Sequence, residues 1–415
     1  MAQREQIPGE GLRPTVAVVG AGPTGLMAAE RLSGAGFGVT IFDGMATPGR
    51  KFLMAGRGGL NLTHSETIEQ FAGRYGVQAT RFRQYLARFS PQDLRNWADG
   101  LGAETFVGSS GRVFPKAMKA SGLLRGWLAR LRGQRVDLRL RHHWRGWSGE
   151  HLRFDLADGS EVLVTPKAVV LALGGASWPK LGADGGWISL LRDQGVAVQP
   201  LRPSNCGFET DWSAHFQEKA AGRPLKNVLL SFSGRQARGE VMITGYGIEG
   251  GPVYALSAAI RDSLASHSPV EVTLDLKPDM SVDALTQRLA ARRHGQSLSQ
   301  FLKKELSLAD ATYSLLRETA ASIPGEPHEI AGLLKALPIR IYRPRPIEQA
   351  ISSAGGLDFA AMTDELMLRA RPGVFACGEM LDWEAPTGGY LLQGCFATAV
   401  IAADGVRSWL NGNPS

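Results

Sequence analysis

The sequence is poor in cysteine and has no long apolar run. Its three cysteines, Cys206, Cys377 and Cys395, are never two residues apart, so no CxxC pair is present. We therefore expect neither a disulfide scaffold nor a cysteine-based metal site or dithiol redox centre. No uninterrupted stretch of about 18 apolar residues occurs, and the first fourteen residues lack the apolar segment of a signal peptide. We expect a cytoplasmic protein that does not bind membranes.

Glycine, in contrast, is abundant, at 51 of 415 residues. TVAVVG (15–20) predicts a buried strand that runs into the turn GAGPTG (20–25), a helical segment and a second strand ending at Asp43. This is the β-turn-α-β unit of a dinucleotide-binding domain. In it Gly20 permits the tight turn, Gly22 lets a pyrophosphate approach the backbone, and Gly25 lets the helix pack closely on the strand. The helix N-terminus would bind the phosphates, and Asp43 would accept hydrogen bonds from ribose hydroxyls.

The residues after the second strand favour FAD over NAD. GMATPGRKFLMAGRGGLNLTH (44–64) is a glycine-rich basic loop, as in proteins that cover an extended FAD. Lys51 and Arg57 would stabilise negative charge on the reduced flavin. AVVLALGGASWPKLGADG (168–185) predicts a strand returning beside the FAD, and residues 372–406 predict a strand, an acidic loop and a helix starting near Gly388 that points at the flavin N1/C2=O edge.

The residues that we assign to FAD binding come from these segments. They are Gly20, Gly22, Pro23, Thr24, Gly25, Asp43, Gly49, Arg50, Lys51, Arg57, Gly58, Asn61, Trp144, Gly174, Gly378, Glu379, Asp382, Gly388, Gly389, Tyr390 and Leu391.

The middle of the chain differs in character from its two ends. Short alternating segments predict a β-rich insertion, a small barrel or sandwich, over 196–280, and helical periodicity predicts a helical insertion over 281–338. The expected fold is α/β. It is a Rossmann-like FAD-binding domain of the three-layer, glutathione-reductase-like kind, formed by 1–195 and 339–415 and interrupted by a β-barrel plus helical insertion that roofs the flavin.

Five motifs in order resemble one family. GRKFLMAGRGGLNLTH, SGRVFPKAMKAS, LALGGASWPKLGADG, GEVMITGYGIEGGPVYALS and CGEMLDWEAPTGGYLLQ are similar to segments of the bacterial BaiN/RdsA-type flavoproteins, over about residues 14–410. The chain departs from the common family pattern at Leu60, His64, Gly245 and Glu249, as a distinct subfamily would. The resemblance implies an NAD(P)/FAD-dependent oxidoreductase. Reductions attributed to relatives are those of a steroid-like enone in bile-acid metabolism and of a uridine C5=C6 bond in ribosomal RNA.

Both reductions add a hydride and a proton across an electron-poor alkene. Tyr246 and Glu249 from the insertion and His64 from the basic loop are the candidate proton donors. Each has a structural alternative: Tyr246 in a core, Glu249 as a helix cap, and His64 paired with Glu66. We expect no second nucleotide-binding domain in the insertion, so NAD(P)H would have to reach the flavin transiently, or another donor must serve.

The charge distribution favours RNA as the substrate. The segment 112–153 holds eleven Lys and Arg against Asp137 and Glu150, an excess of nine in a chain of net charge +7. Trp127, Trp144 and Trp147 lie within it and would stack on bases, although Trp144 is also placed to pass the adenine of FAD and Trp127 fits an amphipathic helix. A solvated helix face is the alternative interpretation of the charge. Other functional alternatives are a small-molecule enone reductase, a flavin-bound RNA-binding protein without turnover, and an aromatic hydroxylase.

Overall fold

The computed structural model describes residues 3–4, 15–308, 310–320 and 322–412. Residues 5–14, where we expect no signal segment, lie outside the described residues. The chain divides into two compact units, Met1–Arg202 with Ser352–Ser415, and Pro203–Ile351. Each unit has a hydrophobic core of its own.

The first unit is built on a parallel sheet whose strands run in the order β21-β11-β2-β3-β7. All five residues of β2 are buried, which explains its uniformly apolar, β-branched sequence. The strands are β2 (Thr15–Val19), β3 (Gly38–Asp43), β7 (Asp137–Leu140), β11 (Ala168–Leu171) and β21 (Val374–Ala376).

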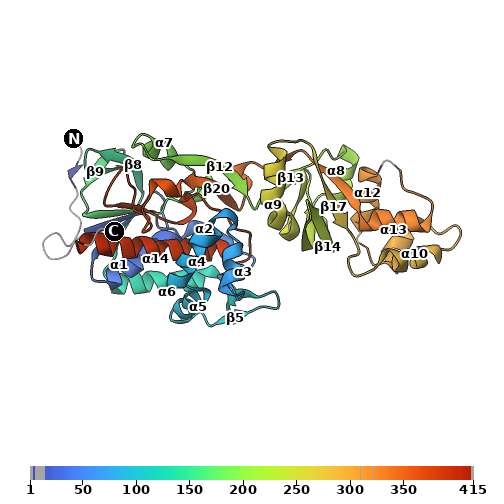
Figure 1. The fold of residues 1–415 in the computed structure, drawn as a ribbon, viewed down its shortest axis with the longest axis horizontal. Coiled ribbons are helices and arrows are strands. Elements are labelled where there is room, and N and C mark those ends of the chain that lie inside the picture. The colour runs from blue at the N-terminus through green and yellow to red at the C-terminus, as the bar shows by residue number, and fades with distance from the viewer. Residues whose placement is uncertain (1–2, 5–14, 309, 321, 413–415) are drawn as a thin grey trace. The chain divides into compact units, whose positions relative to one another are not determined.

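Two further layers cover this sheet. The helices α1 (Pro23–Gly34), α6 (Ala120–Gly133) and α14 (Tyr390–Leu410) run side by side (Figure 1). A second sheet has the order β1-β10-β9-β8. It packs on β3 through Phe42 and Phe154, whose rings stack with centroids 4.5 Å apart. Its strands are β1 (Gln3–Arg4), β8 (His142–Ser148), β9 (His151–Leu156) and β10 (Glu161–Val164). This three-layer arrangement confirms the predicted fold class.

Shorter elements complete the first unit. A three-stranded sheet has the order β4-β6-β5, and β12 pairs with β20 where the chain leaves and re-enters the unit. The strands are β4 (Thr63–His64), β5 (Thr105–Val107), β6 (Arg112–Pro115), β12 (Val198–Ser204) and β20 (Ser352–Leu357). The helices are α2 (Arg50–Ala55), α3 (Ile68–Gly73), α4 (Ala79–Arg88), α5 (Pro91–Asp99) and α7 (Trp187–Arg192), with 3-10 turns η1 (Gly76–Gln78), η2 (Pro179–Leu181), η4 (Phe359–Ala361) and η5 (Gly378–Met380).

The second unit contains a seven-stranded sheet in the order β18-β17-β14-β15-β16-β13-β19. Its two end strands are separated in the chain only by Tyr342. One stretch of chain therefore pairs with β17 and then with β13, so the sheet curls back on itself as a small barrel does. The strands are β13 (Phe208–Glu209), β14 (Pro224–Phe232), β15 (Arg235–Ile243), β16 (Gly247–Gly250), β17 (Val270–Asp275), β18 (Leu337–Ile341) and β19 (Arg343–Pro344).

Helices and strands of the second unit share one core. Leu230 and Val272 of the sheet are fully buried in the same cluster as Leu285 and Leu334 of the helices. The helices are α8 (Ala214–Ala220), α9 (Gly251–Leu264), α10 (Val282–Ala290), α11 (Leu298–Glu305), α12 (Asp310–Thr319) and α13 (Pro327–Lys335), with the 3-10 turn η3 (Ile347–Gln349).

Trp127 is the largest side chain completely enclosed in the first unit's core. It lies on α6 against Trp97 and Phe396, with ring centroids 4.6 and 5.7 Å away. We expect Trp127→Ala to lower the free energy of unfolding by about 3–5 kcal/mol, because it leaves a large cavity. Guanidinium denaturation followed by circular dichroism measures the change. Trp178→Ala, at a tryptophan that is 39% exposed, is the control. Equal shifts for the two variants would contradict the core role of Trp127.

Candidate functional site

The turn between β2 and α1 is closed toward the sheet and open on its other side. Gly20 has a φ of +110°, and a Cβ there would lie 2.3 Å from the carbonyl oxygen of Ala172. A Cβ on Gly25 would lie 1.9 Å from the carbonyl oxygen of Gly20. Gly22, the N-cap of α1, has no side-chain cap, and a Cβ there would meet no atom of the described residues within 4 Å. Backbone N–H groups with free space beside Gly22 are what a phosphate group requires.

Asp43 holds the same turn from the end of β3. Its Oδ2 accepts a hydrogen bond from the Ala21 N–H at 2.6 Å, and its Oδ1 accepts one from the Met45 N–H at 2.7 Å. Burial raises the pKa of Asp43, against the lowering effect of these two hydrogen bonds. The carboxylate therefore shapes the turn, and its predicted contact with a ribose stays a prediction.

Lys51 joins three separate segments. Its ammonium donates to Ser177 Oγ and to Glu379 Oε2, each at 2.6 Å. The other oxygen of Glu379 accepts a hydrogen bond from the Ser353 N–H at 3.0 Å. The positive charge that we expect near the flavin is thus balanced by a carboxylate. Sequence reasoning missed Ser177 and Ser353, since no spacing pattern marks these two hydroxyl residues.

At Gly378 the segment after β21 packs directly against the first turn of α1. Gly378 has a φ of +85°, and a Cβ there would lie 2.5 Å from Thr24 Oγ1. The N–H of Gly49, at the start of α2, donates to the carbonyl of Ala21 at 2.8 Å. Gly174, after β11, accepts a hydrogen bond from the indole of Trp187 at 2.9 Å. The glycine turn, the basic loop and the 378–379 segment are therefore brought together as expected.

The N-terminus of α14 lies against β4. Gly389, its N-cap, has a φ of +97°, and a Cβ there would lie 2.5 Å from the main chain of Thr63. The ring of Tyr390 stacks on His64 with centroids 5.3 Å apart and an interplanar angle of 19°. The carbonyl of Tyr390 accepts a hydrogen bond from the Tyr75 hydroxyl at 2.7 Å. This packing leaves no room for a side chain at the N-cap of α14.

Three of the residues assigned to FAD binding carry buried polar atoms without a hydrogen-bond partner among the described residues. These atoms are Arg50 Nε, Asn61 Oδ1 and Trp144 Nε1. Buried polar atoms are nearly always paired, so these three fit contacts with a bound polar ligand. Together with the open side of the turn at Gly22, the donor set fits a dinucleotide such as FAD. Arg57 and Gly58 are exposed, Asp382 has its pKa raised by burial, and Leu391 is half-buried.

Tyr246 and Glu249 form a hydrogen-bonded pair in the second unit. The Tyr246 hydroxyl donates to Glu249 Oε2 at 2.5 Å. Burial, followed by this hydrogen bond, raises the pKa of Tyr246 well above its ordinary value of 10.0. Gly250, and not Glu249, is the N-cap of α9, and it has no side-chain cap. Sequence reasoning missed Arg345, whose guanidinium lies over the Tyr246 ring at 4.2 Å.

His64 lies in the first unit, and both its ring nitrogens face main-chain groups. Nδ1 accepts a hydrogen bond from the Glu66 N–H at 3.2 Å, so Nε2 is the nitrogen that donates to the Ser110 carbonyl at 2.9 Å. A ring held in this way fits a neutral imidazole. Proton donation by His64, which stays a prediction, would require breaking the bond to Ser110.

The basic segment 112–153 does not form one face. It spans β6, α6, β7, β8 and β9, which belong to different layers of the first unit. The expectation that Trp127 and Trp144 stack on RNA bases is wrong, because they are only 0% and 9% exposed. Five of the eleven cations in segment 112–153 are paired with carboxylates of the described residues. The pairs are Lys116 with Glu104, Arg130 with Glu30, Arg139 with Asp137, Arg145 with Asp155, and Arg153 with Glu161.

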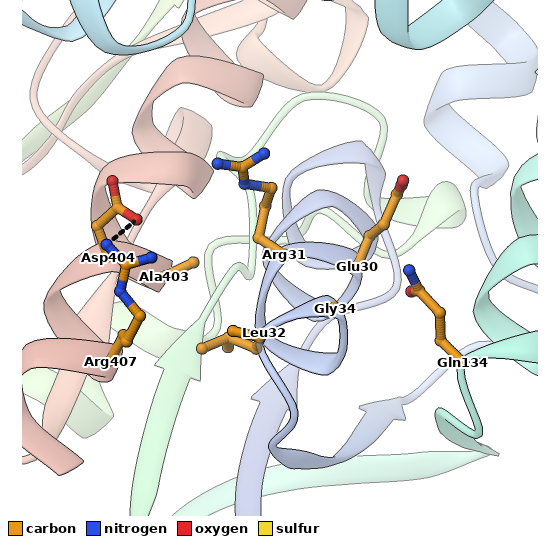
Figure 2. A pocket seen from close by; sticks show the side chains of 9 residues that line it. Glu30, Arg31, Leu32, Gly34, Gln134, Ala403, Asp404 and Arg407 are labelled. Carbon is orange, nitrogen blue, oxygen red and sulfur yellow. Dashed lines mark ion pairs between the residues drawn. The ribbon is translucent and has the colours of Figure 1, made fainter. Parts of the chain in front are cut away.

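A hollow of about 370 Å³ lies at the C-terminal end of α1 (Figure 2). Arg31, Gln134, Asp404 and Arg407 line it, and the last two form an ion pair at 3.4 Å. The glycine turn is at the opposite end of this helix, so the hollow is separate from the dinucleotide cradle. No helix in the described part of the chain is both long and apolar enough to cross a membrane.

Comparisons with known proteins find two enzymes of similar sequence and a structure of similar fold. The chain is 27% identical to the 3-dehydro-bile acid delta(4,6)-reductase of Clostridium scindens, over 93% of this chain and 97% of that protein. It is 25% identical to the ribosomal RNA dihydrouridine synthase of Escherichia coli, over 93% of this chain and 96% of that protein. A flavocytochrome c3 fumarate reductase in its open conformation has a similar fold, with a TM-score of 0.53 and 14% identity over 97% of this chain and 79% of that one.

The fold and the site define a flavin-dependent oxidoreductase with a Rossmann-type domain. The chain belongs to the family described as HI0933-like protein Rossmann domain, whose model matches residues 14–405. The resemblance to BaiN/RdsA-type flavoproteins is thereby confirmed.

Gly22 offers a direct test of the cradle. Its φ of −75° and the open space beside it allow a side chain in the protein alone. We expect Gly22→Asp to fold normally but to lose flavin, because a carboxylate would face the pyrophosphate. The absorbance of the purified protein near about 450 nm measures bound flavin. Gly22→Ala adds a methyl group without charge and is the control. A Gly22→Asp protein with a full flavin band would contradict the cradle.

Proposed function

We propose that this protein reduces an activated C=C bond with bound FAD, and that a uridine of ribosomal RNA is its leading substrate. Two observations support FAD binding: the open turn at Gly22 and the Lys51–Glu379 ion pair beside it in the same unit. The two curated relatives support the reaction type, because saturating a uridine and reducing a conjugated bile-acid alkene share one chemistry. In both, a hydride adds to one alkene carbon and a proton to the other.

The first unit would hold the cofactor. Gly22 and the first turn of α1 would face the diphosphate, and Arg50, Asn61 and Trp144 would use their unpaired atoms on the remaining polar groups. Reduced FAD supplies the hydride in such enzymes. The N-terminus of α14, with no acidic residue in its first turn, would stabilise negative charge near it.

Tyr246 is our proposed proton donor. Tyr246 keeps its phenol protonated because burial and Glu249 raise its pKa, so it would donate from the hydroxyl oxygen. Because that hydroxyl has one proton and donates it to Glu249 in this structure, transfer to the alkene would require the hydroxyl to turn away from Glu249. NAD(P)H is our proposed electron donor, and it would supply two electrons and a proton equivalent for each alkene reduced. It would approach transiently, since we assign the chain a single dinucleotide cradle, the one around Gly22.

A small-molecule enone is the second candidate substrate. The identity to the bile-acid reductase, 27%, is slightly higher than that to the dihydrouridine synthase, 25%. The net charge of +7 favours RNA, because a polyanion gains more from a cationic protein than a small enone with one carboxylate does. A flavin-bound RNA-binding protein without turnover is a third candidate, and it differs from the first in leaving RNA chemically unchanged.

Deleting the gene tests the substrate directly. We expect ribosomal RNA from the deletion strain to lose dihydrouridine at one or a few nucleotides, as measured by mass spectrometry of RNA fragments. A strain complemented with the Gly22→Asp variant is the matched control and should stay unmodified. Unchanged dihydrouridine, together with oxidation of NAD(P)H by enones in vitro, would favour the small-molecule reductase instead.

The acid is tested by Tyr246→Phe. We expect turnover to fall by about 10²- to 10⁴-fold with full flavin content, the usual effect of removing a general acid. Because its pKa is raised, the wild-type phenol stays protonated across neutral and mildly alkaline pH. The rate should therefore show no loss attributable to this group between about pH 7 and 10. Tyr342→Phe, at an exposed tyrosine, is the control. A fully active Tyr246→Phe enzyme would assign the acid elsewhere.

A further inference from the structure

The three-stranded sheet β4-β6-β5 carries four ring or cationic side chains on one face. His64 of β4 lies directly opposite Arg112 of β6, and Phe106 of β5 lies directly opposite Phe114 of β6. Residues directly opposite in an antiparallel pair point to the same side, as do residues two apart in one strand. His64, Arg112, Phe114 and Phe106 therefore share a face, which we call the β6 face.

On the other face of this sheet the residues of β4 and β6 pack on the protein, whereas Val107 of β5 is 43% exposed. Thr63 and Val113 are both fully buried, and Pro115 is buried beside them. The β6 face is instead open to solvent, with Arg112 exposed, Phe106 40% exposed and Phe114 half-buried. The two phenylalanine rings lie 5.9 Å apart, so they present two aromatic surfaces in one small area.

Arg112 on this face and two cations of neighbouring segments have no counter-ion among the described residues. Arg112, Arg57 and Lys119 have no carboxylate within 4.0 Å among the described residues, whereas Lys116 is paired with Glu104. The Lys119 ammonium donates to the carbonyl of Arg57 at 3.3 Å, which ties the basic loop to the segment after β6. Exposed aromatic rings beside uncompensated cations are complementary to a polyanion with flat, unstacked rings.

The β6 face ends beside the helix that we assign to the flavin. His64 stacks on Tyr390, the first residue of α14. The Arg112 Nε lies 3.9 Å from the position that a Cβ on Gly388 would occupy. A strand of nucleic acid held on this face would therefore run up to the N-terminus of α14, where the proposed chemistry occurs.

We propose that the β6 face binds a single-stranded RNA segment, with Phe106 and Phe114 stacking on unpaired bases and Arg112 contacting a phosphate. This inference rests on the proposed function and narrows it, because it replaces the dispersed segment 112–153 by one surface. Single-stranded RNA suits a β-sheet with exposed aromatic rings, since its bases are free to stack. A uridine must also leave its base stack before it can reach a flavin.

The test measures binding by full-length protein, without turnover. The probe is a fluorescent single-stranded oligoribonucleotide of about ten residues, followed by anisotropy over a salt series, with a duplex of the same sequence for comparison. We expect Phe106→Ala to weaken single-strand binding by about 5-fold or more, the usual effect of losing one stacked base. We expect Arg112→Gln to reduce the slope of log K against log salt by about 0.7, one phosphate contact.

Two variants on the same elements are matched controls. Val107→Ala removes an exposed apolar neighbour of Phe106, and Arg125→Gln removes an exposed cation of α6. Both variants should bind the single-stranded RNA with wild-type affinity. Phe106→Trp, which keeps an aromatic ring at this position, should also bind it with wild-type affinity, unlike Phe106→Ala. Equal affinities of Phe106→Ala, Val107→Ala and the wild type would overturn the inference. So would a change in oligomeric state of Phe106→Ala without a change in RNA affinity, because the face would then bind a second copy of the chain.

The outcome separates this inference from the proposed function. If RNA binding depends on Phe106 and Arg112 but no dihydrouridine forms, the β6 face is supported as an RNA-binding surface and the proposed uridine reduction is contradicted. Dihydrouridine formed by Phe106→Ala and Arg112→Gln at wild-type rate and affinity supports the reaction and removes the surface.

Discussion

The first unit depends on close backbone contact at the carboxyl edge of its parallel sheet. Gly20 meets the carbonyl of Ala172, Gly25 meets the carbonyl of Gly20, and Gly378 meets Thr24, each at a distance that excludes any side chain. The ends of β2, β11 and β21, the helix α1 and the turn η5 are thereby held together. Because these contacts use the sheet side of the turn, the opposite side at Gly22 remains open to a ligand. One steric constraint therefore accounts for both the packing of the fold and the position of the cofactor cradle.

Electrostatics at the site follow from this convergence. Lys51, Glu379 and Ser177 come from distant parts of the chain, and they meet because the turn, the basic loop and the strand ends share one edge of the sheet. The charge of Lys51 is balanced by Glu379, so the protein holds no isolated cation at this point. The dipole of α14, which has no acidic residue in its first turn, is left to favour negative charge on a reduced flavin. In the proposed enzyme, the backbone at the N-terminus of α14 would therefore stabilise the reduced cofactor more than Lys51 would.

Local patterns in the sequence were sufficient for the fold class and for the three glycines of the turn. A buried strand, a turn that requires glycine and an amphipathic helix are properties of contiguous residues, and the family motifs added the order of the remaining segments. The partners of the site residues could not be predicted in this way. Ser177 contacts Lys51, and Ser353 contacts Glu379, only because of the three-dimensional fold. Trp127 and Trp144 were candidates for base stacking in the sequence, but both are buried in the structure. The charge excess of 112–153 misled for the same reason, since contiguity in sequence did not place its cations on one surface.

The dispersal of these cations raises the question of which surface selects the substrate of the proposed reaction. The groups that we propose to hold a dinucleotide lie at the sheet edge of the first unit. Glu249 lies on β16, and Tyr246 directly precedes this strand. In the proposed reaction neither set of groups would recognise more of the substrate than its alkene. Substrate choice must then depend on surfaces near the site, and Phe106 and Arg112 occupy a hairpin whose length and composition can change without disturbing the core, because one of its faces is solvent-exposed. If the β6 face binds RNA as proposed, a change confined to this peripheral sheet would exchange an RNA strand for a small enone without altering the proposed reduction.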